Sequence, residues 1–313
     1  MARFRRRVVL AKIETVYGTD PVPTGAANAL LMRNVDITPF ASDLVERTTV
    51  RSWRGIEQSL HANTHVVIEG ELEFTPSGTK DVPPKYGPMV RACAFAEAIT
   101  ATVKVAYTPI STADESVAAH FFMDGSLHIA TGVRGTLNGI RLASGEIAAL
   151  RGRWLGLYNA PTATANAVPD FSAYVKPKIV NKANTPTFTL HGFAGVLSEL
   201  TIDLGNDVTA IDRVGSTGAH VDIDDRSPSG TIVIEAPALG TKDFFAIAAA
   251  ETTGALQVVH GSGDGGIVQI DAPNVQLINP RYTALPGGTA GLAMDLRLVP
   301  GAAGDDELVI TTK

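Results

Sequence analysis

The sequence predicts a mainly β protein with two tandem β-sandwich or barrel-like domains, each with one flanking α-helix, preceded by an extended N-terminal arm. Three observations predict this class. Residues 65–72 (HVVIEGEL) find an echo in residues 231–238 (TIVIEAPA), and each is followed by an Ala-rich helical stretch and closing strands. Short segments alternate apolar and polar residues, as strands with one wet face do. The 30 Gly and 18 Pro suit the many turns of such a fold.

The composition is that of a soluble globular protein. Hydrophobic residues make up 45% and charged residues 19% of the 313 residues, a length that accommodates two domains with cores of their own. No apolar stretch is long enough for a membrane span, and Glu14 interrupts any signal-peptide core after the basic start, so we expect synthesis in the cytoplasm and no membrane partner. The single cysteine, Cys93, excludes an internal disulfide and favours a small buried side chain.

Charge is distributed unevenly along the chain. Residues 1–160 carry 17 Lys and Arg against 15 Asp and Glu, whereas residues 161–313 carry 9 against 17. An acidic second half disfavours a general DNA-binding protein, although a surface past which DNA slides can be acidic.

Residues 1–28 are predicted to form the arm. Residues 8–13 are strand-like, and residues 18–25 (GTDPVPTG) hold two prolines and two glycines that no regular element tolerates. We expect this arm to reach a neighbouring molecule rather than to form a core alone.

The first domain is expected at residues 29–160. A strand over 30–38 closes at Pro39, and the polar stretch 40–63 is predicted to be a long loop or an extended hairpin. In the strand that follows, Glu69, Glu71 and Glu73 alternate with Gly70, Leu72 and Phe74, which predicts an acidic wet face.

A helix is expected at residues 89–99, which are rich in alanine and follow Pro88. Asp124-Gly125 predicts a tight hairpin turn, because both residues accept a positive φ. The remaining strands of this domain are expected at 103–108, 117–123, 126–131, 133–142 and 147–158.

Residues 161–186 contain several prolines and little periodicity, so they are predicted to be a linker. The second domain, 187–313, repeats the element order of the first and has its helix at 242–251. Its strands are expected at 188–193, 199–204, 208–214, 220–224, 230–236, 254–259, 266–271, 275–283 and 291–299.

Motifs for catalysis or metal binding are not found in the sequence. Asp222, Asp224 and Asp225 lack the glycine and the distal glutamate of a calcium loop, and the glycine-rich residues 261–266 are explained by a hairpin turn. The seven histidines are scattered, and HExxH, GxSxG, Walker and GxGxxG patterns are missing. We therefore expect no enzyme activity, no cofactor and no metal.

Four segments together resemble one family. They are residues 12–24 (KIETVYGTDPVPT), 28–39 (NALLMRNVDITP), 86–97 (YGPMVRACAFAE) and 155–161 (LGLYNAP). In combination they are similar to the tail tube, or major tail, proteins of long-tailed, non-contractile bacteriophages and related prophages. The resemblance covers residues 8–191 well and the second half by architecture.

The resemblance implies β-sandwich-like tube domains whose sheets join edge to edge in rings, which stack into a channel for viral DNA in the virion tail after assembly in the host cytoplasm. A chain with two tube domains is expected to form a trimeric ring with pseudo-sixfold symmetry, and a hexamer if the second domain decorates the exterior. Implied partners are further copies of the chain, DNA in transient passage, a tape measure protein, a tail terminator and a baseplate or distal tail protein.

Two groups of residues are candidates for these roles. The acidic residues expected to face the channel are Glu69, Glu71, Glu73 and Glu235. Candidates for contacts between subunits or rings lie in the arm and in residues 40–63: Arg5, Arg6, Arg7, Tyr17, Asp43, Glu46, Arg47, Arg51, Trp53 and Arg54.

Two other classes remain as alternatives. A secreted or surface-exposed β-sandwich adhesin that binds carbohydrate would also be β-rich, but the two tryptophans and the missing signal argue against it. A glycan-cleaving enzyme would need two carboxylates across a cleft, whereas Glu69 and Glu71 lie on one strand face as a charged wall.

Overall fold

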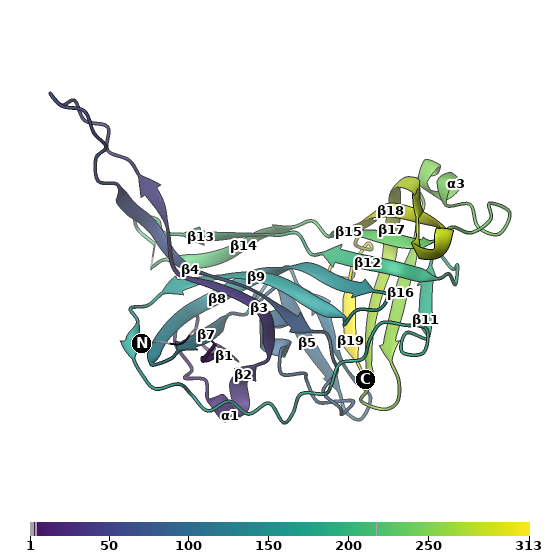
Figure 1. Cartoon of the computed structure of the whole chain (residues 1–313), viewed down its shortest axis with the longest axis horizontal. Coiled ribbons are helices and arrows are strands. Elements are labelled where there is room, and N and C mark those ends of the chain that lie inside the picture. The colour runs from purple at the N-terminus through teal and green to yellow at the C-terminus, as the bar shows by residue number, and fades with distance from the viewer. Residues whose placement is uncertain (1–2, 4, 217) are drawn as a thin grey trace.

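The computed structural model describes residues 3, 5–216 and 218–313. Within these residues, 17 strands are joined in one antiparallel sheet system, and a further pair forms a sheet of its own. The strands of the first half curve around an interior, those of the second half continue beside them, and a long hairpin projects from the body (Figure 1). The predicted mainly β class is confirmed.

The described elements follow one another in this order: β1 (Arg7–Ile13), α1 (Gly25–Asn28), β2 (Ala29–Leu30), β3 (Met32–Val45), β4 (Leu60–Glu73), α2 (Gly87–Arg91), β5 (Phe95–Thr100), β6 (Lys104–Pro109), β7 (Val117–Met123), β8 (Ser126–Ala143), β9 (Ala149–Tyr158), β10 (Thr162–Ala163), β11 (Thr187–Leu190), β12 (Leu197–Asp203), β13 (Asn206–Ile211), β14 (His220–Arg226), β15 (Ser229–Glu235), α3 (Phe244–Ala249), β16 (Thr253–Gly261), β17 (Ile267–Ala284), the 3-10 turn η1 (Pro286–Gly288), β18 (Ala290–Leu298) and β19 (Val309–Thr312).

The first half has the strand order β1–β7–β8–β9–β4–β3. The inward side chains of β4, such as Ile68 and Leu72, pack in the core with Trp154 of β9, which is fully buried. The Trp154 indole N–H donates to the carbonyl of Met89 at 3.1 Å and so fixes α2 against this sheet.

The start of the expected arm belongs to this sheet. β1 pairs along its whole length with β7, and Leu10 is fully buried. Residues 7–13 therefore form a strand of their own chain and are not free to reach a neighbour. Residues 1, 2 and 4 of the predicted arm lie outside the described residues.

The second half has the order β11–β16–β17–β18–β15–β12. Counterparts are assigned by chain order. The strands β11, β12, β15, β16, β17 and β18 correspond to β1, β3, β4, β7, β8 and β9, and each holds the same place in its sheet as its counterpart. The helix also falls at the same point, because α2 follows β4 and α3 follows β15. The same topology thus occurs twice in the chain.

One long strand in each half replaces two expected ones. β8 spans the predicted strands 126–131 and 133–142, and β17 spans 266–271 and 275–283. The pairing of β8 with β9 shifts between Thr131 and Arg134, where Gly132 has a positive φ of 58°. This bulge lets the strand bend and continue instead of ending.

Strand pairing joins the two halves at two places. β12 pairs with the last part of β8, from Glu199 opposite Ala143 to Ile202 opposite Ile140. β19, which was not predicted from the sequence, pairs with β17 and with β6. Side chains from both halves belong to a single buried cluster, so the described residues do not separate into two cores.

The helix expected at 89–99 is wrong over most of its length. α2 ends at Arg91, Ala94 takes a positive φ of 59°, and Phe95–Thr100 is strand β5, paired with β6. Sheet pairing and the burial of Phe95 override the helix propensity of the alanines. The helix expected at 242–251 is found as α3, at Phe244–Ala249.

The predicted linker 161–186 runs along the body (Figure 1) and is fastened to it. Near its end, buried His260 of β16 makes two contacts, with the carbonyl of Lys178 through Nε2 at 3.3 Å and with the Thr185 hydroxyl through Nδ1 at 2.9 Å. A neutral ring that donates from Nε2 and accepts at Nδ1 satisfies both. Burial lowers the pKa of His260, against the opposing effect of the Lys178 carbonyl.

Acidification is therefore expected to loosen this attachment. Because the pKa of folded His260 lies below that of the unfolded chain, near 6.5, the unfolded state binds the proton first and stability falls as the pH drops from about 7 to about 5. Melting curves should show a smaller pH-dependent drop for His260→Gln than for the wild type. A drop remains in the variant, because burial also lowers the pKa of His191, which both proteins contain. Drops of equal size in the two proteins would contradict the role of His260.

Candidate assembly surfaces

The most prominent feature of the surface is the hairpin formed by β3 and β4, which projects from the body (Figure 1). The stretch 40–63 was expected to be a loop or an extended hairpin, and it is an extended hairpin with its tip at residues 46–59. The expected end of a strand at Pro39 is wrong, because β3 passes through Pro39 with a bulge between Thr38 and Ala41. An edge strand accommodates proline, since one of its sides lacks a partner.

The hairpin exposes apolar side chains to water, which gives a single molecule no stabilisation. Trp53 is 69% and Ile56 is 92% exposed, and Leu44, Val45 and Leu60 are exposed as well. Such a concentration of exposed apolar residues marks a surface for another protein.

The charged tip residues mostly organise the tip itself. The Glu57 carboxylate binds the Arg51 guanidinium at 2.5 Å and the Thr49 hydroxyl, and Arg47 lies 4.0 Å away. Asp43 accepts a hydrogen bond from the Asn63 side chain at 2.8 Å across the hairpin. Glu46 and Arg54 are exposed at the tip.

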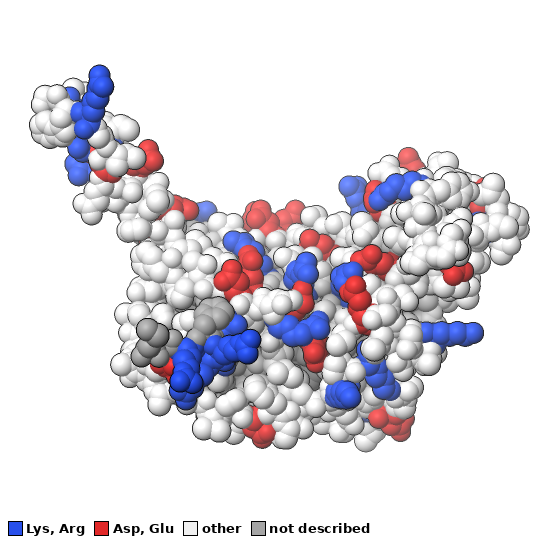
Figure 2. All heavy atoms as spheres, viewed as in Figure 1, with Lys and Arg blue, Asp and Glu red and all other residues white. Residues whose placement is uncertain are grey.

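The predicted acidic face of β4 lies opposite a row of arginines. On β9, Arg151 stands opposite Glu71 and Arg153 opposite Glu69, with ion pairs of 2.7 and 3.2 Å. Arg33 of β3 lies 3.6 Å from Glu71 and 4.0 Å from Glu73. Figure 2 shows both signs of charge interleaved across the middle of this face. The expectation of a purely acidic face is therefore wrong: the face is mixed in charge.

Glu71 is the centre of this row. Burial alone would raise its pKa, but the hydrogen bond and charge of Arg151, with Asn34 and Arg33, outweigh burial and lower the pKa. Glu71 therefore stays ionised well into the acidic range. The sequence carried a signal for its partners, because Arg151-Gly152-Arg153 shows the same period of two as the glutamates.

The remaining sequence candidates lie in different places. Arg5 is exposed before β1, Arg6 pairs with Asp124 at 2.9 Å, and Arg7 donates to the carbonyl of Val35. Tyr17 makes contacts within its own chain, where its hydroxyl accepts a hydrogen bond from the Val221 N–H at 2.6 Å. Glu235 is exposed at the end of β15.

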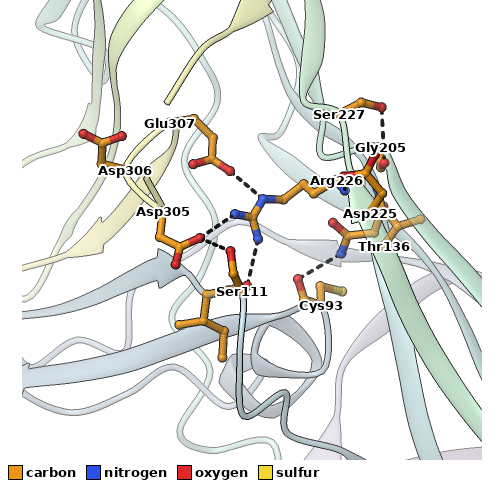
Figure 3. A network of polar contacts seen from close by, with 12 residues as sticks. Cys93, Ser111, Thr136, Gly205, Asp225, Arg226, Ser227, Asp305, Asp306 and Glu307 are labelled. Atoms are coloured by element: carbon orange, nitrogen blue, oxygen red, sulfur yellow. Dashed lines mark hydrogen bonds and ion pairs between the residues drawn. The ribbon is translucent and has the colours of Figure 1, made fainter. Parts of the chain in front are cut away.

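A polar network ties the end of β14 to the C-terminal segment (Figure 3). It was not predicted from the sequence. The Arg226 guanidinium binds Glu307 at 2.5 Å, Asp305 at 3.0 Å and the carbonyl of Ile110 at 3.0 Å. Glu307 is buried, and only one of its oxygens has a partner. Nothing in the local sequence pairs residues 81 positions apart, so only the fold reveals this contact.

Asn206 fastens β13 to the first half. Its buried side-chain amide donates to the carbonyls of Cys93 and Gly135, both at 3.0 Å. These bonds give two backbone carbonyls a hydrogen-bond partner in the interior.

Two features of the described residues bear on other functions. No group of three or more His, Cys, Asp or Glu side chains there is arranged to hold a metal ion. None of the helices in the same residues has the length and apolar character of a membrane span.

Comparison with known families decides the class. Residues 5–298 match the family described as phage tail tube protein. The chain belongs to the phage tail tube protein family. No curated protein matches it. As a tail tube protein, it is a structural, non-enzymatic component that self-assembles into the tube of the virion tail. The adhesin and glycan-cleaving alternatives lose their support.

In this tail tube protein, the Arg226 network is expected to be essential for stability. Arg226→Ala leaves the Glu307 carboxylate buried without its partner and should lower the free energy of unfolding by about 3–5 kcal/mol. Chemical denaturation of the wild type and the variant measures the difference. Arg213→Ala removes an exposed arginine from the turn between β13 and β14 and should change stability by less than about 0.5 kcal/mol. Similar losses in the two variants would refute the network's role.

Proposed function

We propose that the chain forms trimeric rings with pseudo-sixfold symmetry, and that these rings stack into the tail tube of a long-tailed, non-contractile phage. The observation that carries this proposal is the strand topology, which occurs once in residues 7–158 and again in residues 187–298. Each half then counts as one tube domain, with residues 161–186 as the linker, and three chains supply six domains.

The pairing between the halves supports a common wall. β3, β4, β9 and β8 are followed, through the pairing of β8 with β12, by β12, β15, β18 and β17. Each half contributes four strands in the same order to one continuous sheet. A sheet that already crosses from one domain to the next within a chain is suited to continue from chain to chain.

The acidic candidates share one face of this sheet. Residues directly opposite each other on paired strands lie on the same face. The registers place Glu73 opposite Ala149, Ala149 opposite Arg141, Arg141 opposite Thr201 and Thr201 opposite Thr231. Glu235 follows Thr231 at an even spacing, so it lies on the face of Glu69, Glu71 and Glu73.

We assign this face to the channel. Its glutamates are matched by arginines that are already engaged in ion pairs, such as Arg151 with Glu71 and Arg141 with Glu199. Arginines held in this way are poor partners for phosphates, while the remaining carboxylates repel them, so DNA passes without adhering. A tape measure protein within the channel and terminator and distal tail proteins at its ends are the further partners that this function requires.

Electron microscopy with mass measurement of the purified assemblies tests the proposal. Rings or tubes with three chains per ring are expected. Six chains per ring would retain the tail tube but place the second half outside the wall. A protein that stays monomeric under all conditions would contradict assembly by this chain alone.

A further inference from the structure

The junction between the two halves holds more than paired strands. The β13–β14 hairpin, which connects β12 to β15, lies across β8 and β9 of the first half. The Arg134 guanidinium of β8 donates to the carbonyl of Val221 at 3.1 Å and lies 3.4 Å from the Asp222 carboxylate. Tyr17 accepts from the Val221 N–H at 2.6 Å, and its ring lies 5.1 Å from the Arg134 guanidinium. One hairpin is thus anchored on the sheet of the other half.

The outer part of the long β3–β4 hairpin occupies the same place in the topology as the β13–β14 hairpin. It connects the inner parts of β3 and β4, which correspond to β12 and β15 of the second half. The β13–β14 hairpin covers the sheet beyond β12, the outermost strand of the second half. The outer part of the β3–β4 hairpin projects from the body, and among the described residues no sheet lies under it (Figure 1).

The anchoring arginine has a counterpart as well. β17 pairs with β18 with a shift between Ile278 and Arg281, just as β8 pairs with β9 with a shift between Thr131 and Arg134. Asn279 has a positive φ of 50° at the place of Gly132. The two bulges align Arg281 with Arg134. The Arg281 side chain is 56% exposed and contacts Asp295 and the carbonyl of Asn279.

The two edges that would repeat the junction are open. Among the described strands, β3 pairs with β4 alone, and residues 278–284 of β17 pair with β18 alone. β3 and β17 are the counterparts of β12 and β8. Inside the chain, β12 pairs with residues 140–143 of β8. Residues 131–137 of β8, which correspond to 278–284, instead meet the chain just after β12, where the Leu204 N–H donates to the carbonyl of Leu137 and the Asn206 side chain donates to that of Gly135, both at 3.0 Å. An open strand edge presents unpaired N–H and C=O groups to another chain.

We propose that each chain in a ring repeats this internal junction with the next chain. The end of β3, residues 43–45, lies against residues 282–284 of its neighbour's β17, and the β3–β4 hairpin lies across the neighbour's β17 and β18. Arg281 anchors that hairpin as Arg134 anchors β13–β14. The hairpin's exposed apolar residues are then buried within the ring. The inference rests on the proposed trimeric ring and specifies how it closes.

Cysteine crosslinking in assembled protein tests this geometry. By register, Asn206, which binds Gly135 of β8, corresponds to Val45, and Gly135 corresponds to Tyr282. Val45 and Tyr282 are 52% and 61% exposed. The variant Val45→Cys/Tyr282→Cys, treated with a short bismaleimide, should give dimers and trimers on denaturing gels. Native Cys93 does not interfere, because it is fully buried and burial raises its pKa.

The products separate the possible outcomes. Crosslinks that stop at the trimer support contact within a ring. Products that continue beyond the trimer would place the contact between stacked rings and overturn the inference. Tubes that form without crosslinks would also overturn it, while leaving the tail tube function intact; a failure to form rings would refute the proposed function itself. Val45→Cys/Ile99→Cys, with a similarly exposed site on β5, is the control and should give no crosslinks.

Loss of the anchor provides a second test. Arg281→Ala should raise the protein concentration needed for assembly about tenfold, as expected for a hydrogen bond to a charged group. Arg297→Ala is the matched control, because it removes an exposed arginine of β18. The counterpart of Arg297 is Asn159, whose side-chain amide donates to Ile129, Thr131 and Leu157 of the first half and not to the β13–β14 hairpin. Equal assembly of the Arg281 variant and wild type would overturn the anchoring role, provided that both monomers melt alike.

Discussion

The structure depends on the need of every strand edge for a partner. The backbone N–H and C=O groups along a strand edge are stabilised by a partner, either within the chain or in the assembled tube. β8 meets this need by bending at Gly132, so that its first part pairs with β7 and its last part pairs with both β9 and β12. Through this strand, the first half is continuous with the second.

Polar side chains secure what the strand pairing begins. Asn206 and Arg226 stand at the two ends of the β13–β14 hairpin and bond to carbonyls or carboxylates from other segments. Asn206 is buried and Arg226 is partly buried, so an unpaired polar group at either position would be costly. The hairpin is therefore held at its base, and Arg134 and Tyr17 hold it further along.

Local patterns in the sequence predicted much of the fold. Alternation predicted most strands, and Asp124-Gly125 predicted its turn. The likeness of residues 65–72 to 231–238 predicted two tandem domains, which stays a prediction; the first segment lies in β4 and the second starts in β15, two strands that hold equivalent places in the two strand orders. Alanine content misplaced the helix at 89–99, because propensity is weaker than the pairing of Phe95–Thr100 with β6. The arginines facing the glutamates of β4 were missed although their spacing was visible, and Glu307 was missed because its partner is remote in sequence.

The covalent link between the two halves changes how a ring is nucleated. The β8–β12 contact forms inside one molecule, so its strength does not depend on how much protein the host cell has made. In the trimeric ring that we propose, every second contact is thus completed on folding, and only the alternate contacts await diffusional encounter. Because the halves are joined in one chain, the contact inside the chain and the proposed contact between chains can be built from different residues, as Arg134 and Arg281 with their different neighbours illustrate.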